Sequence, residues 1–291
     1  MVRTLAEIKL DADWVLTTSP PESLHVVGSQ LKAVMNCFWI AEFRDTWIIA
    51  PHRQALAKWP WRRMIERRIA KRCLRSIDAI TSVSDAVLSE LRQYVPADTP
   101  ECIIDHFSDA PPAPAKLPAS DLNIVHSGGF NLSDRRRHLA NALRSLDKIN
   151  AQRSDYRIHL HIAGQLSPAE NRLLNARPDD DLTLARVTRL GAVSLDQSRA
   201  LQAGADALLL HTPDNSHALP GKFAEYRQTR VPILYLGGGD WLSLVDDMNA
   251  IQPLESGLVE LQKGDRIPES CSAGFNADSA AAKLVNFLGS L

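Results

Sequence analysis

The chain has 291 residues, with 33 Lys and Arg against 34 Asp and Glu, so its formal charge is −1. This length suits two domains of ordinary size. The balanced charge argues against nucleic acid as a partner, since nucleic-acid-binding proteins are normally basic. A hydrophobic content of 45% excludes a largely disordered chain. No apolar run has the length of a membrane-spanning helix, and the first residues lack a signal-peptide core, so we expect a cytoplasmic protein.

The first third of the chain alternates strand-like and helix-like segments. A helix is expected at 22–36, and Ser84 is a suitable N-cap for a second helix. The segments expected as strands are 14–18, 37–43, 79–83 and 102–105. This alternation is typical of a parallel α/β sheet.

A change in composition marks the expected domain boundary. Residues 109–118 contain four prolines, as is typical of a semi-rigid linker. We therefore predict a first domain at 1–116 and a second at 117–277. The final helix, at 278–291, is a candidate to pack back on the first domain.

The α/β alternation restarts after the linker. Ser167 and Ser194 each begin a capping box, in which a Glu or Gln three residues later completes the helix start. A short helix is expected at 222–228. The segments expected as strands are 122–126, 156–162, 207–210 and 232–236.

The strand at 156–162 is expected to have one apolar face. Its other positions include His159 and His161. We interpret both histidines as surface residues of the strand rather than as ligands of a metal.

The first candidate site follows the strand at 122–126. In open parallel sheets, ligands bind at the carboxyl ends of strands, beside helix N-termini. Gly128 and Gly129 lie at such an end and are followed by Arg135, Arg136 and Arg137. Glycines let backbone amides approach a phosphate, and arginine is a forked donor for it. Solvated arginines after a glycine-rich strand end are also common, so this loop alone is a weak signal.

The second candidate site follows the strand at 207–210. This segment carries His217 and leads into Pro220-Gly221-Lys222 at the start of the short helix. A helix start with a lysine offers amides, a positive helix end and an ammonium to a phosphate. Glu225, one turn later, can accept hydrogen bonds from the hydroxyls of a ribose. The alternative is an ordinary helix start with solvated Lys222 and Glu225.

A third strand end, in the first domain, carries Arg44 and Asp45 directly after 37–43. These are candidate catalytic residues. A structural salt bridge is the alternative interpretation.

Taken together, several short segments resemble the glycosyltransferase family 4-like (group 1) glycosyltransferases, in the order in which that family has them. The segments are Asp13–Pro21, Glu42–Trp47, Ile80–Ser84, Ile124–Gly129, Ile162–Gly164, Ala205–Asp206, Pro220–Tyr226 and Pro232–Leu234. The resemblance implies an α/β protein with the GT-B fold, in which two Rossmann-like domains each contain a parallel sheet. It also implies transfer of a sugar, of the hexosyl type, from a nucleotide-diphosphate sugar to a polysaccharide or lipid-linked acceptor. Retention of configuration and no requirement for a metal or other cofactor are expected.

The resemblance also assigns roles to residues of the second domain. Glu225 matches the glutamate that holds the donor ribose, and Lys222 with an arginine among 135–137 matches the pair that binds the diphosphate. His217 stands where the family usually has a second glutamate, which weakens the assignment of the sugar contact. The full expected donor-binding set is Gly128, Gly129, Arg135, Arg136, His217, Gly221, Lys222 and Glu225.

The first domain departs further from the family. The position of the family's catalytic histidine corresponds to Thr18 or Ser19, so His25 is the substitute placed with Arg44 and Asp45 in the candidate catalytic set. The family's first β-α-β units have no counterpart before Trp14. We therefore expect an incomplete N-terminal domain with an exposed flank and little or no sugar transfer by this chain.

Two other functions are compatible with the sequence. One is a non-catalytic GT-B-like module that binds a nucleotide or a partner subunit, which the missing front units favour. The other is a nucleotide-sugar epimerase, for which the Arg44-Asp45 segment gives no support.

The segment from Trp59 to Arg75 is strongly basic. It contains seven Arg and Lys against the single acid Glu66, together with apolar residues at helical spacing. Such a helix can rest on an anionic membrane surface, where basic residues are attracted to lipid headgroups. A packed helix with a solvated basic face is the alternative. If the helix rests on a membrane, the cytoplasmic protein is expected to lie at the inner face of that membrane.

Overall fold

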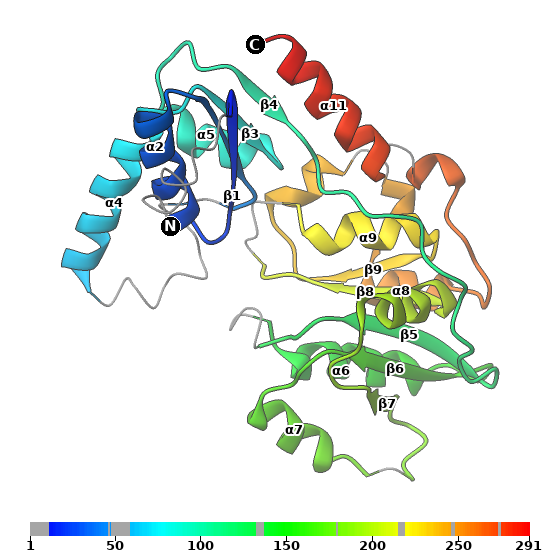
Figure 1. Cartoon of the computed structure of the whole chain (residues 1–291). Helices are drawn as coiled ribbons and strands as arrows, with labels where there is room; N and C mark the ends of the chain where they lie inside the picture. The colour runs from blue at the N-terminus through cyan, green and yellow to red at the C-terminus, as the bar shows by residue number, and fades with distance from the viewer. Residues whose placement is uncertain are drawn as a thin grey trace. The chain divides into compact units, whose positions relative to one another are not determined.

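The computed structural model describes residues 12–45, 47, 59–131, 137–178, 180–214, 219–245, 248–272 and 275–291. The chain forms two compact units, one of residues 1–106 with 280–291 and one of residues 107–279 (Figure 1).

The division between the units falls before the proline-rich stretch rather than at 116–117. Ser108 N donates to Phe275 O at 2.9 Å, and Ala115 N donates to Ala200 O at 2.8 Å. A Cβ on Gly204, the last residue of a helix in the second unit, would clash with the carbonyl of Ala115. The proline-rich stretch is thus packed along the second unit and belongs to it.

The first unit is built on a four-stranded parallel sheet with strand order β1-β2-β3-β4. Its elements are β1 (Trp14–Ser19), α2 (Ser23–Met35), β2 (Phe38–Phe43), α4 (Pro60–Leu74), β3 (Ala79–Ser82), α5 (Asp85–Arg92), β4 (Glu101–Ile103) and α11 (Ala277–Gly289). Ser84 caps α5 by accepting from Val87 N at 3.4 Å, as its position in the sequence predicts.

One face of this sheet carries the core of the first unit. Trp39, Phe43 and Ile80 on the strands pack with Leu74 and Leu88 on α4 and α5. β1 is the edge strand among the described residues, and its Trp14 and Leu16 are exposed. Beyond β4, Lys283 Nζ of α11 donates to Asp105 Oδ2 at 2.6 Å.

The second unit is built on a six-stranded parallel sheet with strand order β10-β9-β8-β5-β6-β7. Its strands are β5 (Asp121–Ser127), β6 (Arg157–Ala163), β7 (Arg186–Arg189), β8 (Ala207–His211), β9 (Ile233–Leu236) and β10 (Ile251–Pro253). Its α-helices are α6 (Leu139–Asn150), α7 (Pro168–Asn175), α8 (Leu195–Gly204), α9 (Gly221–Thr229) and α10 (Leu254–Glu260). Short 3-10 turns are at Asp240–Leu244, Met248–Ala250 and Glu269–Ser272.

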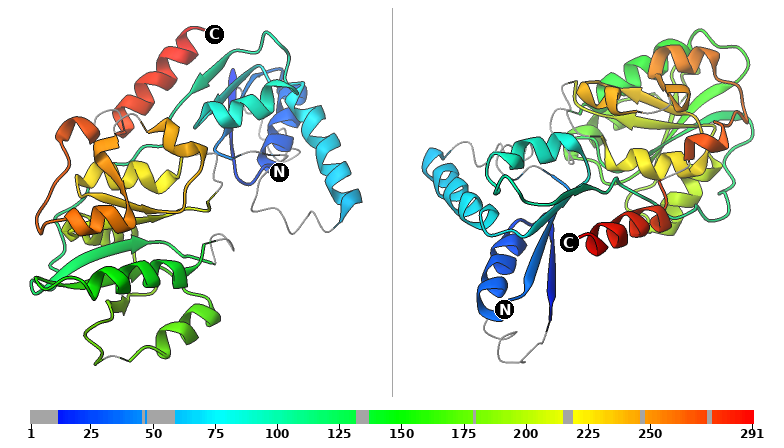
Figure 2. Two further views of the ribbon diagram at one scale, coloured as in Figure 1. Left: turned by 180° about the vertical axis from the view of Figure 1, so that it is seen from behind. Right: turned by 90° about the horizontal axis from the view of Figure 1, so that it is seen from above.

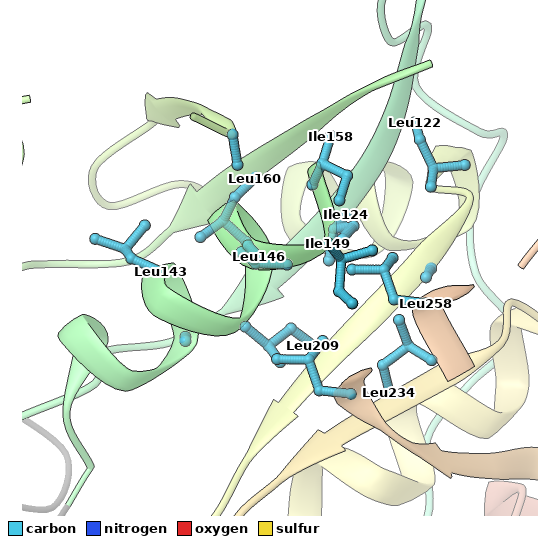
Figure 3. Close-up of a cluster of buried hydrophobic side chains, with 14 of the residues drawn as sticks. Leu122, Ile124, Leu143, Leu146, Ile149, Ile158, Leu160, Leu209, Leu234 and Leu258 are labelled. Carbon is cyan, nitrogen blue, oxygen red and sulfur yellow. The ribbon is translucent and has the colours of Figure 1, made fainter. Parts of the chain in front are cut away.

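Helices cover both faces of the second sheet. On one face, Leu143, Leu146 and Ile149 of α6 pack on β5 and β6 with Leu258 of α10 (Figure 3). On the other face, Phe223 of α9 packs with residues of β8 and β9. The alternation of strands and helices can be followed from two further directions in Figure 2. Both units therefore have the parallel α/β architecture that the sequence predicts.

The prediction that His159 and His161 lie on the surface is wrong. Each residue is only 4% exposed, and the two rings stack with their centroids 3.9 Å apart. His159 Nδ1 lies 2.9 Å from Asp121 Oδ2, and His161 Nε2 lies 3.0 Å from Asn123 Oδ1. The alternation along β6 is as predicted, but its second face is buried among hydrogen-bonded polar groups instead of being exposed to solvent.

Candidate functional site

The candidate site of the second unit begins at the carboxyl end of β5. Gly128 has a φ of 114°, which a side chain would strain, and its N–H donates to Ala163 O at 2.9 Å. A Cβ on Gly164 would clash with the carbonyl of Gly128. Two glycines thus let the turns after β5 and β6 lie against each other. Because Gly128 and Gly129 have no side chains, a ligand can approach the backbone directly after β5.

Helix α9 brings Lys222 and Glu225 to the same end of this sheet. Its N-cap residue is Pro220, which has no side-chain acceptor to cover the first amides of the helix. Lys222 Nζ contacts both carboxylate oxygens of Glu225, at 2.8 Å and 3.0 Å. The lysine side chain is 39% exposed and that of the glutamate 20% exposed. Both charges are therefore paired with each other while remaining accessible from solvent.

Buried hydrogen bonds join α9 to the end of β5. Tyr226 Oη accepts from Ser127 N at 3.0 Å. Gln202 of α8 donates from Nε2 to Ser127 Oγ at 2.7 Å and to Glu225 Oε2 at 3.1 Å. Burial raises the pKa of Tyr226 to about 12, so its hydroxyl stays protonated at neutral pH. These contacts fix the position of Glu225 relative to the glycine turn.

His126 is the next-to-last residue of β5 and is buried. Its ring stacks on Phe130 with centroids 4.1 Å apart, and Nδ1 donates to Leu209 O at 2.9 Å. Burial lowers the pKa of His126 to about 4, and the nearby positive charges of Arg137 and Lys222 act in the same direction. A neutral His126 leaves the positive charge at this end of the sheet to Lys222 and Arg137.

The structure brings all five of the described donor-site residues to one end of the second sheet. Gly128, Gly129, Gly221, Lys222 and Glu225 lie at or near the ends of β5 and β8, because parallel strands direct their carboxyl ends to one edge. Arg135, Arg136 and His217 lie outside the described residues.

The predicted catalytic residues of the first unit have different surroundings. Arg44 is exposed, and its Nε donates to Ser19 O at 3.3 Å. Asp45 is half-buried. His25 has no exposed surface, and Thr17 Oγ1 is 2.8 Å from its Nδ1.

The environment of His25 bears on its predicted catalytic role. Its ring lies among aromatic side chains, with its centroid 4.2 Å from that of Phe43 and 5.7 Å from that of Trp47. Burial lowers the pKa of His25 to about 4. In this conformation the enclosed ring packs among these aromatic side chains, and its catalytic role stays a prediction.

One residue near Arg44 and Asp45 was not singled out from the sequence. His106 follows β4, and burial lowers its pKa, as does the charge of Arg44, while Asp45, Asp105 and Glu42 raise it. The carboxyl ends of β2 and β4 therefore bring an imidazole within electrostatic range of the Arg44-Asp45 segment. The only available signal was its place at the end of an expected strand, just before the prolines.

The described part of the chain has neither a metal-binding cluster nor a membrane-spanning helix. It contains no group of three or more His, Cys, Asp or Glu arranged to hold a metal ion. None of its helices is long and apolar enough to cross a membrane.

Helix α4 carries the basic segment predicted from the sequence. Its buried side consists of Ala70, Cys73 and Leu74. Apolar residues nearer its start are 43–54% exposed, namely Trp59, Trp61, Met64, Ile65 and Ile69. The Arg62 guanidinium lies 5.5 Å from the ring of Trp61. The helix is thus packed at its end and exposes both apolar and basic side chains over the rest of its length.

The sequence matches no known family model and no curated protein. The structure is similar to that of HepE from Anabaena in complex with UDP and glucose, with a TM-score of 0.66 and 16% identity over 100% of this chain and 81% of that one. It is also similar to sucrose-phosphate synthase from Thermosynechococcus elongatus, with a TM-score of 0.64 and 17% identity over 99% and 76% of the two chains. The lipopolysaccharide outer core galactosyltransferase WaaB gives a TM-score of 0.59 and 10% identity over 99% and 79%. The chain therefore has the GT-B fold, which confirms the predicted fold.

Proposed function

We propose that this GT-B chain binds a nucleotide-diphosphate sugar in its second unit and transfers the sugar to a polysaccharide or lipid-linked acceptor. The observation that carries the proposal is that Glu225, paired with Lys222, is joined through Gln202 to Ser127, the residue before Gly128 and Gly129. The structures of HepE with UDP and glucose support a nucleotide sugar as the ligand of this fold. Hexosyl transfer with retention of configuration is part of the proposal.

In this proposal the diphosphate lies between the glycine turn and the start of α9. Backbone amides and the positive end of the helix favour an anion there. Lys222 would leave Glu225 to contact the phosphates, and Arg135 or Arg136 would be the second cation. These cations would stabilise the negative charge that grows on the leaving diphosphate, without a metal in that role.

Glu225 would accept hydrogen bonds from the two ribose hydroxyls. A carboxylate has two oxygens that only accept, which suits a pair of neighbouring hydroxyl donors. Because Gln202 and Lys222 already contact this carboxylate, it is held in place before a ligand arrives.

Binding of uridine diphosphate and of uridine to the full chain, measured by calorimetry, tests the proposal. Lys222→Ala removes a charged contact to phosphate, so it should weaken the diphosphate about 10- to 100-fold and leave uridine nearly unchanged. Glu225→Ala should weaken both ligands, because the ribose is common to them. If neither uridine, guanosine nor adenosine diphosphate binds at millimolar concentration, the proposed site is wrong.

A non-catalytic module is the alternative that the sequence leaves open. It would bind the nucleotide sugar through the same residues without turnover. Radiolabelled sugar transfer to oligosaccharide and membrane-lipid acceptors distinguishes the two, because only the transferase moves label into an acceptor. The same measurement tests the expectation from the sequence of little or no transfer, which robust turnover would overturn.

We also propose that α4 rests on an anionic membrane surface, at the inner face of the membrane. Trp61, Ile65 and Ile69 recur every four residues and are exposed. Arg68 and Arg72 lie three residues after Ile65 and Ile69, on the same side of the helix, and are also exposed. A helix that exposes aromatic and aliphatic side chains together with basic ones suits the plane of a lipid interface, where each basic residue contributes about 1 kcal/mol.

Flotation with vesicles tests this surface. Wild-type protein should bind vesicles that contain phosphatidylglycerol more tightly than vesicles of phosphatidylcholine alone. Arg68→Glu with Arg72→Glu should reduce that binding at least tenfold. Arg144→Glu with Arg172→Glu changes the net charge equally at exposed sites of the second unit and is the matched control. Equal losses for the two pairs would refute a role for α4.

A further inference from the structure

Gln202 is a fully buried polar side chain next to the proposed ribose site. It lies on α8, one of the helices that cover the same face of the sheet as α9 (Figure 1). Its Nε2 contacts Ser127 Oγ at 2.7 Å, Glu225 Oε2 at 3.1 Å and Ser198 Oγ at 3.2 Å. A long polar side chain with no exposed surface has to be held by such contacts, since burial without them is costly.

The carboxylate of Glu225 dictates which way the amide of Gln202 faces. A carboxylate accepts hydrogen bonds and cannot donate, so the amide nitrogen rather than the oxygen must lie against it. Serine hydroxyls can accept or donate and are compatible with either orientation. The contact between Gln202 and Glu225 is therefore directional, and an acceptor at position 202 would oppose it.

Lys222 and Gln202 hold the same carboxylate in different ways. The Lys222 side chain is 39% exposed and lies at a helix start where an anion is favoured, whereas Gln202 is enclosed and anchored to the end of β5 through Ser127. When a phosphate draws the ammonium away, Glu225 loses one of its two holding groups. Gln202 does not depend on the phosphate and stays in place.

We propose that Gln202 is a positioning residue that orients Glu225 for the ribose and keeps it oriented while Lys222 engages the diphosphate. This inference rests on the proposed function. Gln202 acts through Glu225 and makes no contact with the ligand itself. Its loss should therefore weaken ligands that carry a ribose and spare those that do not.

A double-mutant cycle on the full chain tests the inference, with uridine and inorganic pyrophosphate as probes. Gln202→Met keeps the length of the side chain and removes its donors, so uridine should bind about tenfold more weakly while pyrophosphate is unaffected. In a Glu225→Ala background the same substitution should have no further effect on uridine, since the group on which Gln202 acts is gone. Gln152→Met, at an exposed glutamine of the second unit, is the matched control and should change nothing.

The outcomes separate this inference from the proposed function. If the wild-type chain binds no uridine or diphosphate, both fail. If it binds them and Gln202→Met binds uridine equally well, only the inference fails. Equal losses of uridine binding in the presence and absence of Glu225 would show a merely structural role for Gln202. Gln202→Glu is the second variant if Gln202→Met does not fold, and its acceptor facing Glu225 should weaken uridine at least as much.

Discussion

Three buried histidines have pKa values lowered to about 4, and burial is the largest cause in each case. They are His25 in the first unit and His126 and His161 in the second. A neutral imidazole can be buried at modest cost, whereas an imidazolium loses its hydration. The fold therefore binds fewer protons at these sites than the unfolded chain does.

The stability of the protein should decrease in mildly acidic solution. The folded pKa values of about 4 lie below the unfolded value of 6.5, so the contribution of these histidines to stability is complete above pH 6.5. It is lost as the pH falls from 6.5 towards 4, by up to about tenfold in the folding equilibrium per pH unit and per histidine. Urea unfolding at pH 7.5 and pH 5.0 measures the loss. His161→Gln should reduce the difference between the two pH values, and His138→Gln, at an exposed histidine, should leave it unchanged.

Gly28 lets α2 pack closely against strands β1 and β2 of the first sheet. A Cβ at this position would clash with the indole of Trp39 and would lie 2.8 Å from Thr17 Cγ2. We expect Gly28→Ala to lower the free energy of unfolding by about 1–3 kcal/mol, the usual cost of overpacking. Gly289→Ala is the control, because a Cβ there meets nothing within 4 Å. Denaturant unfolding of the two variants gives the comparison, and equal stabilities would contradict the packing described here.

Single residues could be predicted from the sequence where a local motif identifies them. The position of Lys222 and Glu225 near the start of a helix follows from the local sequence, and their binding roles stay proposals. The contacts of Gln202 and the burial of His25 could not be predicted, because the partners of each come from other elements and the sequence does not show which faces become enclosed. Burial of a polar side chain is a property of the tertiary structure.

At the scale of elements, the two capping boxes predicted in the second unit form at the starts of α7 and α8. Ser167 and Glu170 make both hydrogen bonds of a capping box at the start of α7, at 3.3 Å and 2.7 Å. Glu170 Oε1 also accepts from Asn131 N at 2.9 Å, which ties α7 to the segment after β5. Ser194 and Gln197 form the corresponding box on α8.

Removing one of these caps should cost a predictable amount of stability. Ser167→Ala leaves the N–H of Glu170 without its acceptor, and we expect a loss of about 0.5–2 kcal/mol in the free energy of unfolding. Ser256→Ala, at an exposed serine of α10, should cost much less. Chemical denaturation measures both. A loss no larger for Ser167 than for Ser256 would mean that the box contributes little.

Two strands of the second unit could not be predicted from the sequence. β7 reads Arg-Val-Thr-Arg and β10 has three residues, so neither shows the apolar run of a buried strand. Both lie at the edges of the six-stranded sheet, where pairing with one neighbour determines the strand. The central strands β5 and β8 are buried throughout and were evident from their apolar residues.

At the scale of the whole molecule, the described donor-site residues all belong to the second unit. Gly128, Gly129, Gly221, Lys222 and Glu225 lie within residues 107–279, while Arg44 and Asp45 lie within 1–106. The sequence predicts two α/β units from the restart of the alternation. It predicts a linker at the proline-rich stretch, because the contacts of this stretch with α8 are tertiary and do not show in the sequence. A nucleotide bound as proposed contacts only the second unit. It should therefore stabilise residues of that unit and leave those of the first unit unchanged.

Hydrogen–deuterium exchange should therefore show protection by uridine diphosphate in the second unit. A ligand stabilises only the states that bind it, by about 2.7 kcal/mol at 100 times its dissociation constant. Amides that exchange through local opening of the site should then exchange about 100-fold more slowly, in peptides that cover the end of β5 and helix α9. Strands β2 and β3 of the first unit should exchange at an unchanged rate. Glu225→Ala at the same nucleotide concentration is the control and should lose most of the protection. Equal protection of both units by the nucleotide would contradict a binding site contained in residues 107–279.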